Sequence, residues 1–207
     1  MTVDTSRIAR GYPGASRRIA PFAQSVWLGV DALFERHPDM IFFGNGAPAP
    51  DLIPIERLRE ASARAWADGV AALSYGESEG YAPLRRLIAE RMAAIGAAAD
   101  PDEILVVNGS QEGMDILARA LLEPGDVVIV EGPTFPDAIR LFASYEAQVV
   151  AAPMDAHGLD VAALPPVLDA LPHPPKFLYT IPTFQNPTGA TMTAARRRAL
   201  ADLARER

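Results

Sequence analysis

Three short polar segments of this chain carry residue types suited to a flat, anionic ligand. Residues 108–111 read Asn-Gly-Ser-Gln, residues 131–136 read Glu-Gly-Pro-Thr-Phe-Pro, and residues 186–189 read Asn-Pro-Thr-Gly. The first segment offers backbone N–H groups and a hydroxyl at the start of an expected helix, which suit a phosphate. The Phe135 ring can stack on a planar ring. The Asn186 amide can donate to a phenolate oxygen and so favour its ionised form.

Each segment also has a purely structural interpretation. Ser110 can be a helix N-cap with an acidic partner nearby. Phe135 can close over the hydrophobic core, and the segment that begins at Asn186 can be a proline turn that holds no ligand. Taken singly, these structural interpretations are the better ones. The functional interpretation gains its weight because all three segments occur in order, each at the end of an expected strand.

The elements expected around these segments alternate between strand and helix. Short apolar runs predict strands at 104–107, 127–130, 148–152 and 177–181. Helical patterns predict helices at 21–37, 55–67, 83–95, 110–122, 136–145, 161–171 and 193–207. Continuous apolar strands joined by crossover helices indicate a largely parallel sheet covered on both faces. In such sheets ligands bind at the carboxyl ends of the strands, where the polar segments fall.

Composition limits the remaining functions. The chain has 207 residues, 49% of them hydrophobic, and a net charge of −7, which disfavours the basic face of a nucleic-acid-binding protein. It has no cysteine, which excludes disulfides and thiol nucleophiles. Its histidines lack metal-ligand spacing, and the arginines at 196–198 are expected on a solvated helix face. No apolar run suggests a membrane span or a signal peptide, so we expect a cytoplasmic protein without a membrane partner.

Read together, the polar segments resemble those of the class I/II aminotransferases, which are fold-type I enzymes dependent on pyridoxal 5′-phosphate (PLP). The resemblance is to the branch that contains 2-aminoadipate aminotransferases and the effector domains of MocR-like regulators. Residues 43–51 resemble the family's N-terminal glycine loop, and residues 73–76 with 80–85 resemble its Tyr-Gly…Gly-x-x-Pro-Leu-Arg signature. The resemblance covers about residues 40 to 207.

This resemblance implies a fold and a division into domains. The fold is the N-terminal part of the fold-type I PLP-dependent transferase fold, an α/β architecture with a mostly parallel, incomplete sheet and helices on both faces. Residues 1–54 would form an N-terminal arm and a small-domain segment. Residues 55–207 would form part of the large PLP-binding domain.

The resemblance also implies site residues. Those expected to hold PLP are Gly109, Ser110, Gln111, Phe135, Asn186 and Tyr75. The first three would cradle the phosphate, Phe135 would stack on the pyridine ring, and Asn186 would bond the phenolic oxygen. Tyr75 would reach the phosphate of the neighbouring subunit's cofactor, which implies a homodimer. Gly46, through its backbone, and Asn186 would lie against the amino acid or 2-oxo acid substrate.

The family's chemistry also needs a lysine that holds PLP as a Schiff base. The chain has a single lysine, Lys176, which precedes an expected strand and therefore lies at the end opposite the ligand. We expect no catalytic residue from this chain, with the Schiff-base lysine, the pyridine-binding Asp and the carboxylate-binding Arg all downstream. The expected function is that of a fragment of a PLP-dependent aminotransferase, which moves an amino group from an amino acid to a 2-oxo acid.

Two other functions stay open. The chain could be the effector-binding, aminotransferase-like domain of a MocR-type regulator, but that protein needs a basic winged-helix segment before residue 20, and a start at Met1 leaves no room for one. It could also be a short, non-catalytic paralogue that serves as a subunit or binding protein. The sequence does not separate an aminotransferase from a related PLP lyase, nor does it give the amino donor.

Overall fold

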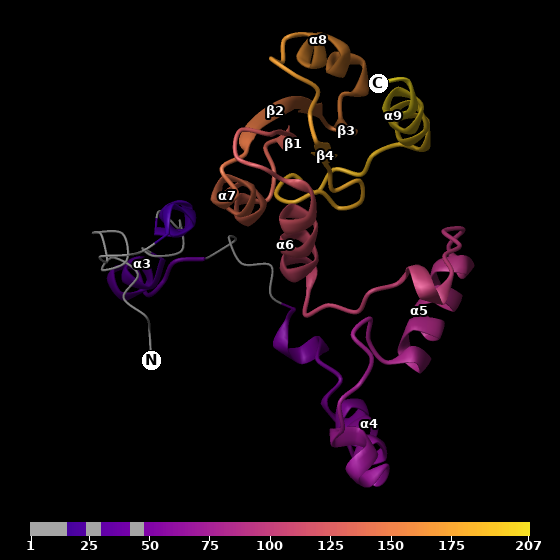
Figure 1. Cartoon of the computed structure of the whole chain (residues 1–207). Coiled ribbons are helices and arrows are strands. Elements are labelled where there is room, and N and C mark those ends of the chain that lie inside the picture. The colour runs from indigo at the N-terminus through magenta and orange to yellow at the C-terminus, as the bar shows by residue number, and fades with distance from the viewer. Residues whose placement is uncertain (1–15, 24–29, 42–47) are drawn as a thin grey trace. The chain divides into compact units, whose positions relative to one another are not determined.

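The computed structural model describes residues 16–23, 30–41 and 48–207. These residues belong to two compact units (Figure 1). The first, which we call the sheet unit, comprises Met1–Asp31 with Asn108–Arg207, and the second, the helical unit, comprises Ala32–Val107. Across the described residues, no helix combines the length and the apolar character that a membrane crossing requires. The expected functional division near residue 54 stays an expectation.

The sheet unit is built on four strands in the order β3–β2–β1–β4. Their bounds are β1 Val127–Gly132, β2 Gln148–Asp155, β3 Gly158–Leu159 and β4 Phe177–Tyr179. Strand β1 pairs in parallel with both β2 and β4, and only the short β3 is antiparallel to its neighbour. The expected mostly parallel sheet is confirmed. Because β1 and β4 run in the same direction, their carboxyl ends lie at one edge of the sheet.

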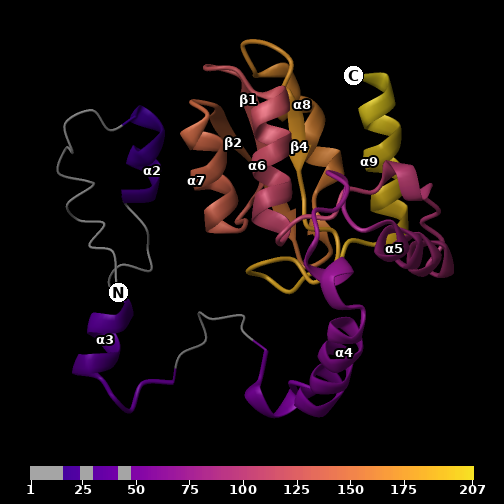
Figure 2. The ribbon, with the colours of Figure 1, turned by 60° about the horizontal axis from the view of Figure 1, so that its bottom comes forward.

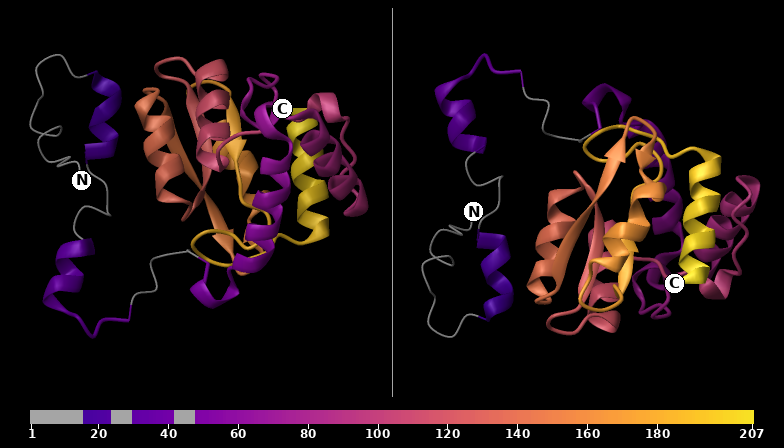
Figure 3. Two further views of the ribbon diagram at one scale, coloured as in Figure 1. Left: turned by 90° about the horizontal axis from the view of Figure 1, so that it is seen from below. Right: turned by 90° about the horizontal axis from the view of Figure 1, so that it is seen from above.

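Helices cover both faces of this sheet, as expected (Figures 2 and 3). They are α6 Ser110–Leu121, α7 Pro136–Ser144, α8 Leu164–Asp169 and α9 Ala194–Glu206. Alternate residues of a strand point to opposite faces. Val128 and Val130 therefore join the core beneath α6 and α7, while Ile129 joins the core beneath α8 and α9. This explains why β1 is apolar at every position from 127 to 130.

The aromatic residues of β4 tie that strand to α7. The Phe142 ring meets the rings of Phe177 and Tyr179 edge to face, with centroids 5.4 and 5.6 Å apart. Burial raises the pKa of Tyr179, and the nearby Glu131 carboxylate raises it further. The packing thus holds β4 and β1 under one helix and brings a carboxylate close to the end of β4.

Most helices lie where the apolar spacing predicts them, but two differ. The 161–171 helix is a 3-10 turn, η6 Val161–Ala163, followed by the short α8. The region predicted as one helix at 21–37 contains α2 Ala20–Ala23 and α3 Val30–Arg36, with 24–29 outside the described residues. Prolines 165 and 166 stand in the first turn of α8, where their missing N–H groups are tolerated.

The prediction of a strand at 104–107 is wrong, and strand β4 is shorter than the predicted 177–181. Residues 104–107 belong to no strand, and the Val106 N–H donates to the Glu79 carbonyl instead, at 2.9 Å. An apolar run becomes a strand only beside a partner strand. Strand β4 ends at Tyr179 because the Ile181 N–H donates to the Glu131 carboxylate rather than to a neighbouring strand.

Arg85 links three segments of the helical unit. The main elements of this unit are α4 Ile55–Ala67, η4 Gly69–Leu73, α5 Ala82–Ala94 and η5 Pro101–Glu103. Arg85 of α5 is buried and binds the Pro101 carbonyl, Asp102 and Glu77, at 2.9, 3.2 and 3.0 Å. Hydrogen bonding to Glu77 raises the pKa of Arg85. The guanidinium therefore ties α5 to segments on either side of it.

The apolar face of α4, which carries Leu58 and Trp66, is exposed. Their exposed fractions are 54% and 61%, and α4 has no buried residue. The spacing that favours the helix is present, but no described residue of the helical unit covers this face.

Gly80 packs tightly against Val106, because a Cβ atom added at Gly80 would stand 2.6 Å from the Val106 Cβ. Its φ of +105° also favours glycine.

Candidate active site at the carboxyl edge of the sheet

A buried carboxylate stands at the carboxyl end of β1. Glu131 is 1% exposed, although it lies in an otherwise apolar strand. It accepts hydrogen bonds from the Thr180 hydroxyl at 2.5 Å, the Ile181 N–H at 3.1 Å and the Gln185 amide at 3.0 Å. A buried carboxylate needs such donors to offset its lost hydration. Glu131 therefore joins the end of β1 to the chain that follows β4.

Gln185 carries this connection into the turn that follows. It is 1% exposed, and its Nε2 donates to Glu131 and to the Pro133 carbonyl, the latter at 2.9 Å. Its Oε1 accepts from the backbone N–H and the hydroxyl of Thr188, at 2.9 and 2.7 Å. Its own carbonyl accepts from the Gly189 N–H at 2.6 Å. One side chain thus binds both the segment after β1 and the turn at 186–189.

Asn186 stands at the start of that turn with an exposed side chain. The peptide bond between Asn186 and Pro187 is cis. Residues 186–188 form a turn, which the Gly189 N–H closes by donating to the Gln185 carbonyl, so the proline-turn interpretation is correct as a description of local structure. It does not compete with a ligand role, because the turn is anchored from inside by Gln185 while the Asn186 side chain remains exposed.

The start of α6 is open to an anion. Gly109 is the N-cap, with a φ of 88° and no side-chain cap, and Ser110 is the first helical residue. The interpretation of Ser110 as an N-cap is therefore wrong. Ser110 and Gln111 are exposed. Glu112 turns toward Asn108, accepting from its backbone N–H and, at 3.0 Å, from its side-chain amide.

Phe135 is the N-cap of α7 and is half-buried against the core beneath α6 and α7. Its structural interpretation, as a ring that closes over the core, is therefore correct. Its neighbour Thr134 is 4% exposed, and its hydroxyl has no hydrogen-bond partner within the described part of the chain. A half-buried ring keeps a free portion on which a ligand could stack.

The structure places the expected site residues as follows. Gly109, Ser110, Gln111, Phe135 and Asn186 all belong to the sheet unit. The Gln185 amide links the segments that contain Phe135 and Asn186. Tyr75 is fully exposed in the helical unit, and Gly46 lies outside the described residues. The roles expected of these residues toward a ligand stay predictions.

Lys176 lies at the other end of the β1–β4 pair. Its backbone N–H donates to the Val127 carbonyl at 2.8 Å, and its Nζ stands 3.6 Å from the Asp126 carboxylate. Both partners are at the beginning of β1, whereas Glu131 is near its end. The expectation that Lys176 lies at the end opposite the ligand is supported for the segments at 131–136 and 186–189, which follow β1 and β4.

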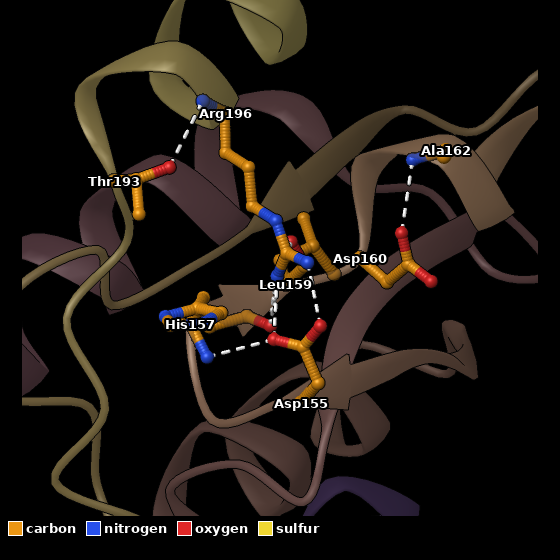
Figure 4. Close-up of polar contacts among 8 residues, drawn as sticks. Asp155, His157, Leu159, Asp160, Ala162, Thr193 and Arg196 are labelled. Atoms are coloured by element: carbon orange, nitrogen blue, oxygen red, sulfur yellow. Dashed lines mark hydrogen bonds and ion pairs between the residues drawn. The ribbon is translucent and has the colours of Figure 1, made fainter.

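A second polar cluster fixes α9, the helix that follows the Asn186 turn (Figure 4). Arg196 binds both oxygens of Asp155, at 2.6 and 2.5 Å, and also the carbonyls of Gly158 and Leu159. The Arg196 guanidinium, helped by the His157 N–H, lowers the pKa of Asp155 to about 2. The prediction that the arginines at 196–198 form a solvated face is therefore wrong for Arg196, whose side chain is 24% exposed.

No sequence pattern assigned Glu131 or Gln185 to this hydrogen-bonded network. A signal was present, because a glutamate that follows four apolar residues of a buried strand must find donors. The partners could not be named, since they lie 49 to 54 residues further along the chain.

Three segments of the sheet unit offer groups that suit PLP. The open start of α6 offers N–H groups and a hydroxyl to a phosphate, Phe135 offers a ring face, and Asn186 offers an amide donor. These match the phosphate, the pyridine ring and the phenolic oxygen of that molecule. The described residues contain no group of three or more His, Cys, Asp or Glu side chains that could hold a metal ion.

Comparison with known proteins identifies the family. The family model for aminotransferases of class I and II matches residues 38–207. The 2-aminoadipate transaminase of Thermus thermophilus is 37% identical over 83% of this chain and 42% of its own length. The kynurenine aminotransferase of Pyrococcus horikoshii, solved in complex with PMP, is 31% identical with a TM-score of 0.81, over 99% of this chain and 50% of its own.

A regulator is also similar. The uncharacterized HTH-type transcriptional regulator YdcR of Escherichia coli is 32% identical over 81% of this chain and 36% of its own length. The chain thus spans about half or less of the length of the relatives it matches. The expected α/β architecture of fold-type I is confirmed, because the chain matches about half of the solved relative at this TM-score. The chain belongs to the class I and II aminotransferase family.

Proposed function

We propose that the protein to which this chain belongs is a PLP-dependent aminotransferase that moves an amino group from an amino acid to a 2-oxo acid. The observation that carries this proposal is the anchored turn at the carboxyl edge of the sheet. There Gln185 and Glu131 fix the turn that presents Asn186, and they fix it to the segment that leads into Phe135. Bound PLP would supply an electron-withdrawing ring that stabilises negative charge on the substrate.

In this proposal each segment of the site has a separate task. Residues 109–111 bind the phosphate with backbone N–H groups and the Ser110 hydroxyl, aided by the dipole of α6. Phe135 holds the ring plane by stacking. Asn186 donates to the phenolic oxygen and keeps it ionised. Gly46 would approach the substrate carboxylate, and Tyr75 would reach the phosphate bound by a second subunit of a homodimer.

The lysine that the reaction requires is proposed to lie outside residues 1–207 of the full-length protein. Lys176 is the only lysine of this chain. It occupies the end of β4 opposite the Asn186 turn and pairs with Asp126. A lysine there is poorly placed to reach a ligand held at the carboxyl edge.

The test is performed on the full-length protein. The protein is incubated with PLP, reduced with borohydride and digested, and the pyridoxyl-labelled peptide is identified by mass spectrometry. We expect one labelled lysine outside residues 1–207, together with turnover of an amino acid and a 2-oxo acid. A panel that includes 2-aminoadipate and kynurenine would define the substrate. Specific labelling of Lys176 with retained transamination would contradict the placement of the site.

A second function is favoured by the similarity to YdcR. In that case the same PLP site would belong to an effector-binding domain of a regulator. The two functions differ in a simple measurement, since a regulator would bind DNA specifically and would not turn over amino acids at a useful rate. A non-catalytic subunit would show neither property.

A further inference from the structure

We propose that Glu131 is a positioning residue for the PLP site: its buried carboxylate, acting through Gln185, sets the geometry of the Asn186 turn. This inference rests on the proposed function and assigns a role to a residue that would not itself touch the cofactor. It predicts that Glu131 affects cofactor binding through the Asn186 turn rather than by direct contact.

The first part of the argument is the position of Glu131. It lies near the carboxyl end of β1, one residue before the segment 132–136 that leads into α7. Its Oε2 accepts from the Ile181 N–H and from the Gln185 Nε2, while its Oε1 accepts from the Thr180 hydroxyl. All of these donors come from the segment that follows β4. The carboxylate therefore replaces, at this edge, the strand pairing that ends with Tyr179.

The second part of the argument is that the Gln185 side chain uses all of its hydrogen-bonding capacity. Its Nε2 uses one hydrogen for Glu131 and the other for the Pro133 carbonyl, and its Oε1 accepts two bonds from Thr188. An amide side chain has two donor hydrogens and two acceptor sites, so Gln185 is saturated. Any shift of the amide would break one of four bonds in a buried place, where each unpaired group is costly.

The third part is what this network presents. Asn186 is the residue that follows Gln185 in the chain. The turn is closed by the Gly189 N–H, which donates to the Gln185 carbonyl. The Pro133 carbonyl that Gln185 holds is two residues from Phe135. One pair of side chains therefore anchors both backbone segments of the proposed site, the one that precedes Phe135 and the one that carries Asn186. Binding sites require supporting residues of this kind, whose hydrogen bonds hold the ligand-contacting residues in place.

The experiment uses four variants of the full-length protein: Glu131→Ala, Gln185→Ala, the double variant and Glu131→Gln. In Glu131→Gln the new carbonyl can take the place of Oε2, and the new NH₂ can donate to the Thr180 hydroxyl, so the geometry is conserved without the charge. Tyr145→Phe is the matched control. It deletes another side-chain bond of the sheet unit, the part-buried one from the Tyr145 hydroxyl to Asp115 at 2.7 Å, at the far end of α7 from Phe135.

Two readouts are taken for each variant. The first is the affinity for pyridoxamine 5′-phosphate, measured by its fluorescence, because this probe needs no bond to a lysine. The second is hydrogen exchange of the backbone amides at 188–190. The Thr188 N–H donates directly to the Gln185 side chain, so its exchange reports the turn itself.

We expect Glu131→Ala and Gln185→Ala each to weaken binding about tenfold, the effect of losing one or two buried hydrogen bonds. Exchange at 188–190 should accelerate in both. The double variant should lose little more than either single one, because the two side chains act in series. Glu131→Gln should restore most of the affinity, and Tyr145→Phe should leave binding and exchange at the turn unchanged.

Three outcomes would overturn the inference. One is unchanged exchange at the turn in Glu131→Ala. Another is additive losses in the double variant, which would separate the two residues. The third is an affinity loss in Tyr145→Phe equal to that in Glu131→Ala, which would reveal a general effect of stability. If the unmutated protein binds no pyridoxamine 5′-phosphate, the proposed function fails first, and the cofactor role of Glu131 fails with it.

Discussion

The two ends of the β1–β4 pair use charge in opposite ways. At the carboxyl end, Glu131 is 1% exposed and accepts hydrogen bonds from Thr180, Ile181 and Gln185. At the amino end, Lys176 and Asp126 form an ion pair at 3.6 Å, with side chains 43% and 22% exposed. The same two strands carry both arrangements.

The difference shows which kind of charge fixes a structure. Water can replace either partner of an exposed pair, so the pair contributes little and tolerates several geometries. Water does not reach a buried carboxylate, so each of its bonds must be made by a specific donor. The carboxyl edge is therefore the rigid end of the pair, and it is the end that bears the proposed site.

The largest effect is expected from Gln185→Glu. This change places a second carboxylate against buried Glu131 and should lower the free energy of unfolding by about 3 kcal/mol at neutral pH. The penalty should shrink as the pH falls, because protonation of either carboxylate removes the repulsion. Urea melts at several pH values measure it. Gln148→Glu, the same change at an exposed position of β2, is the control and should have little effect.

Thr180→Val should have the next largest effect. The substitution keeps the shape of the side chain and removes one of the donors to Glu131. A buried acceptor that loses one charge-assisted bond should reduce the free energy of unfolding by about 2 kcal/mol. Chemical denaturation measures the loss. A change below about 0.5 kcal/mol would mean that another donor replaces Thr180 and that this end is less rigid than proposed.

Asp155 and Arg196 should give an intermediate, pH-dependent effect. The Arg196 guanidinium and the His157 N–H lower the pKa of Asp155 to about 2. A carboxyl whose folded-state pKa is depressed stabilises the protein above its unfolded pKa, near 4, and loses that contribution as the pH falls toward 2. We expect Asp155→Asn to be less stable at pH 6 and to show a weaker loss between pH 4 and pH 2. Parallel acid dependences of the two proteins would contradict this assignment.

The smallest effect is expected from Lys176→Met. The substitution removes the exposed pair with Asp126 and keeps most of the apolar stem. The melting temperature should change by at most about 1 °C, and added salt should remove the difference. Asp126 is also held by the Glu123 N–H, which is the largest cause of its lowered pKa, so it remains bonded without Lys176. A loss comparable to that of Thr180→Val would show that the two ends do not differ as proposed.

The local elements and the family could be predicted from the residues alone. Helices α5, α6, α7 and α9 and strands β1 and β2 begin within a residue or two of their predicted positions. Their apolar residues recur with the period of a helix or strand, and that period is a local property. The order of the polar segments, with the glycine and Tyr-Gly motifs, pointed to the class I and II aminotransferases, and the family match at 38–207 confirms it.

Strand pairing and the partners of buried charges depend on residues far apart in the chain, so they became known only from the folded structure. The apolar run at 104–107 looks like that of β1, yet it forms no strand because pairing requires a neighbour that local sequence does not specify. The same reason applies to Arg196, because the Asp155 carboxylate that its guanidinium binds lies 41 residues earlier in the chain. It applies also to Glu131, whose donors lie 49 to 54 residues along the chain. A charged residue in an apolar strand predicts that hydrogen-bond partners are needed, but the tertiary structure supplies those partners.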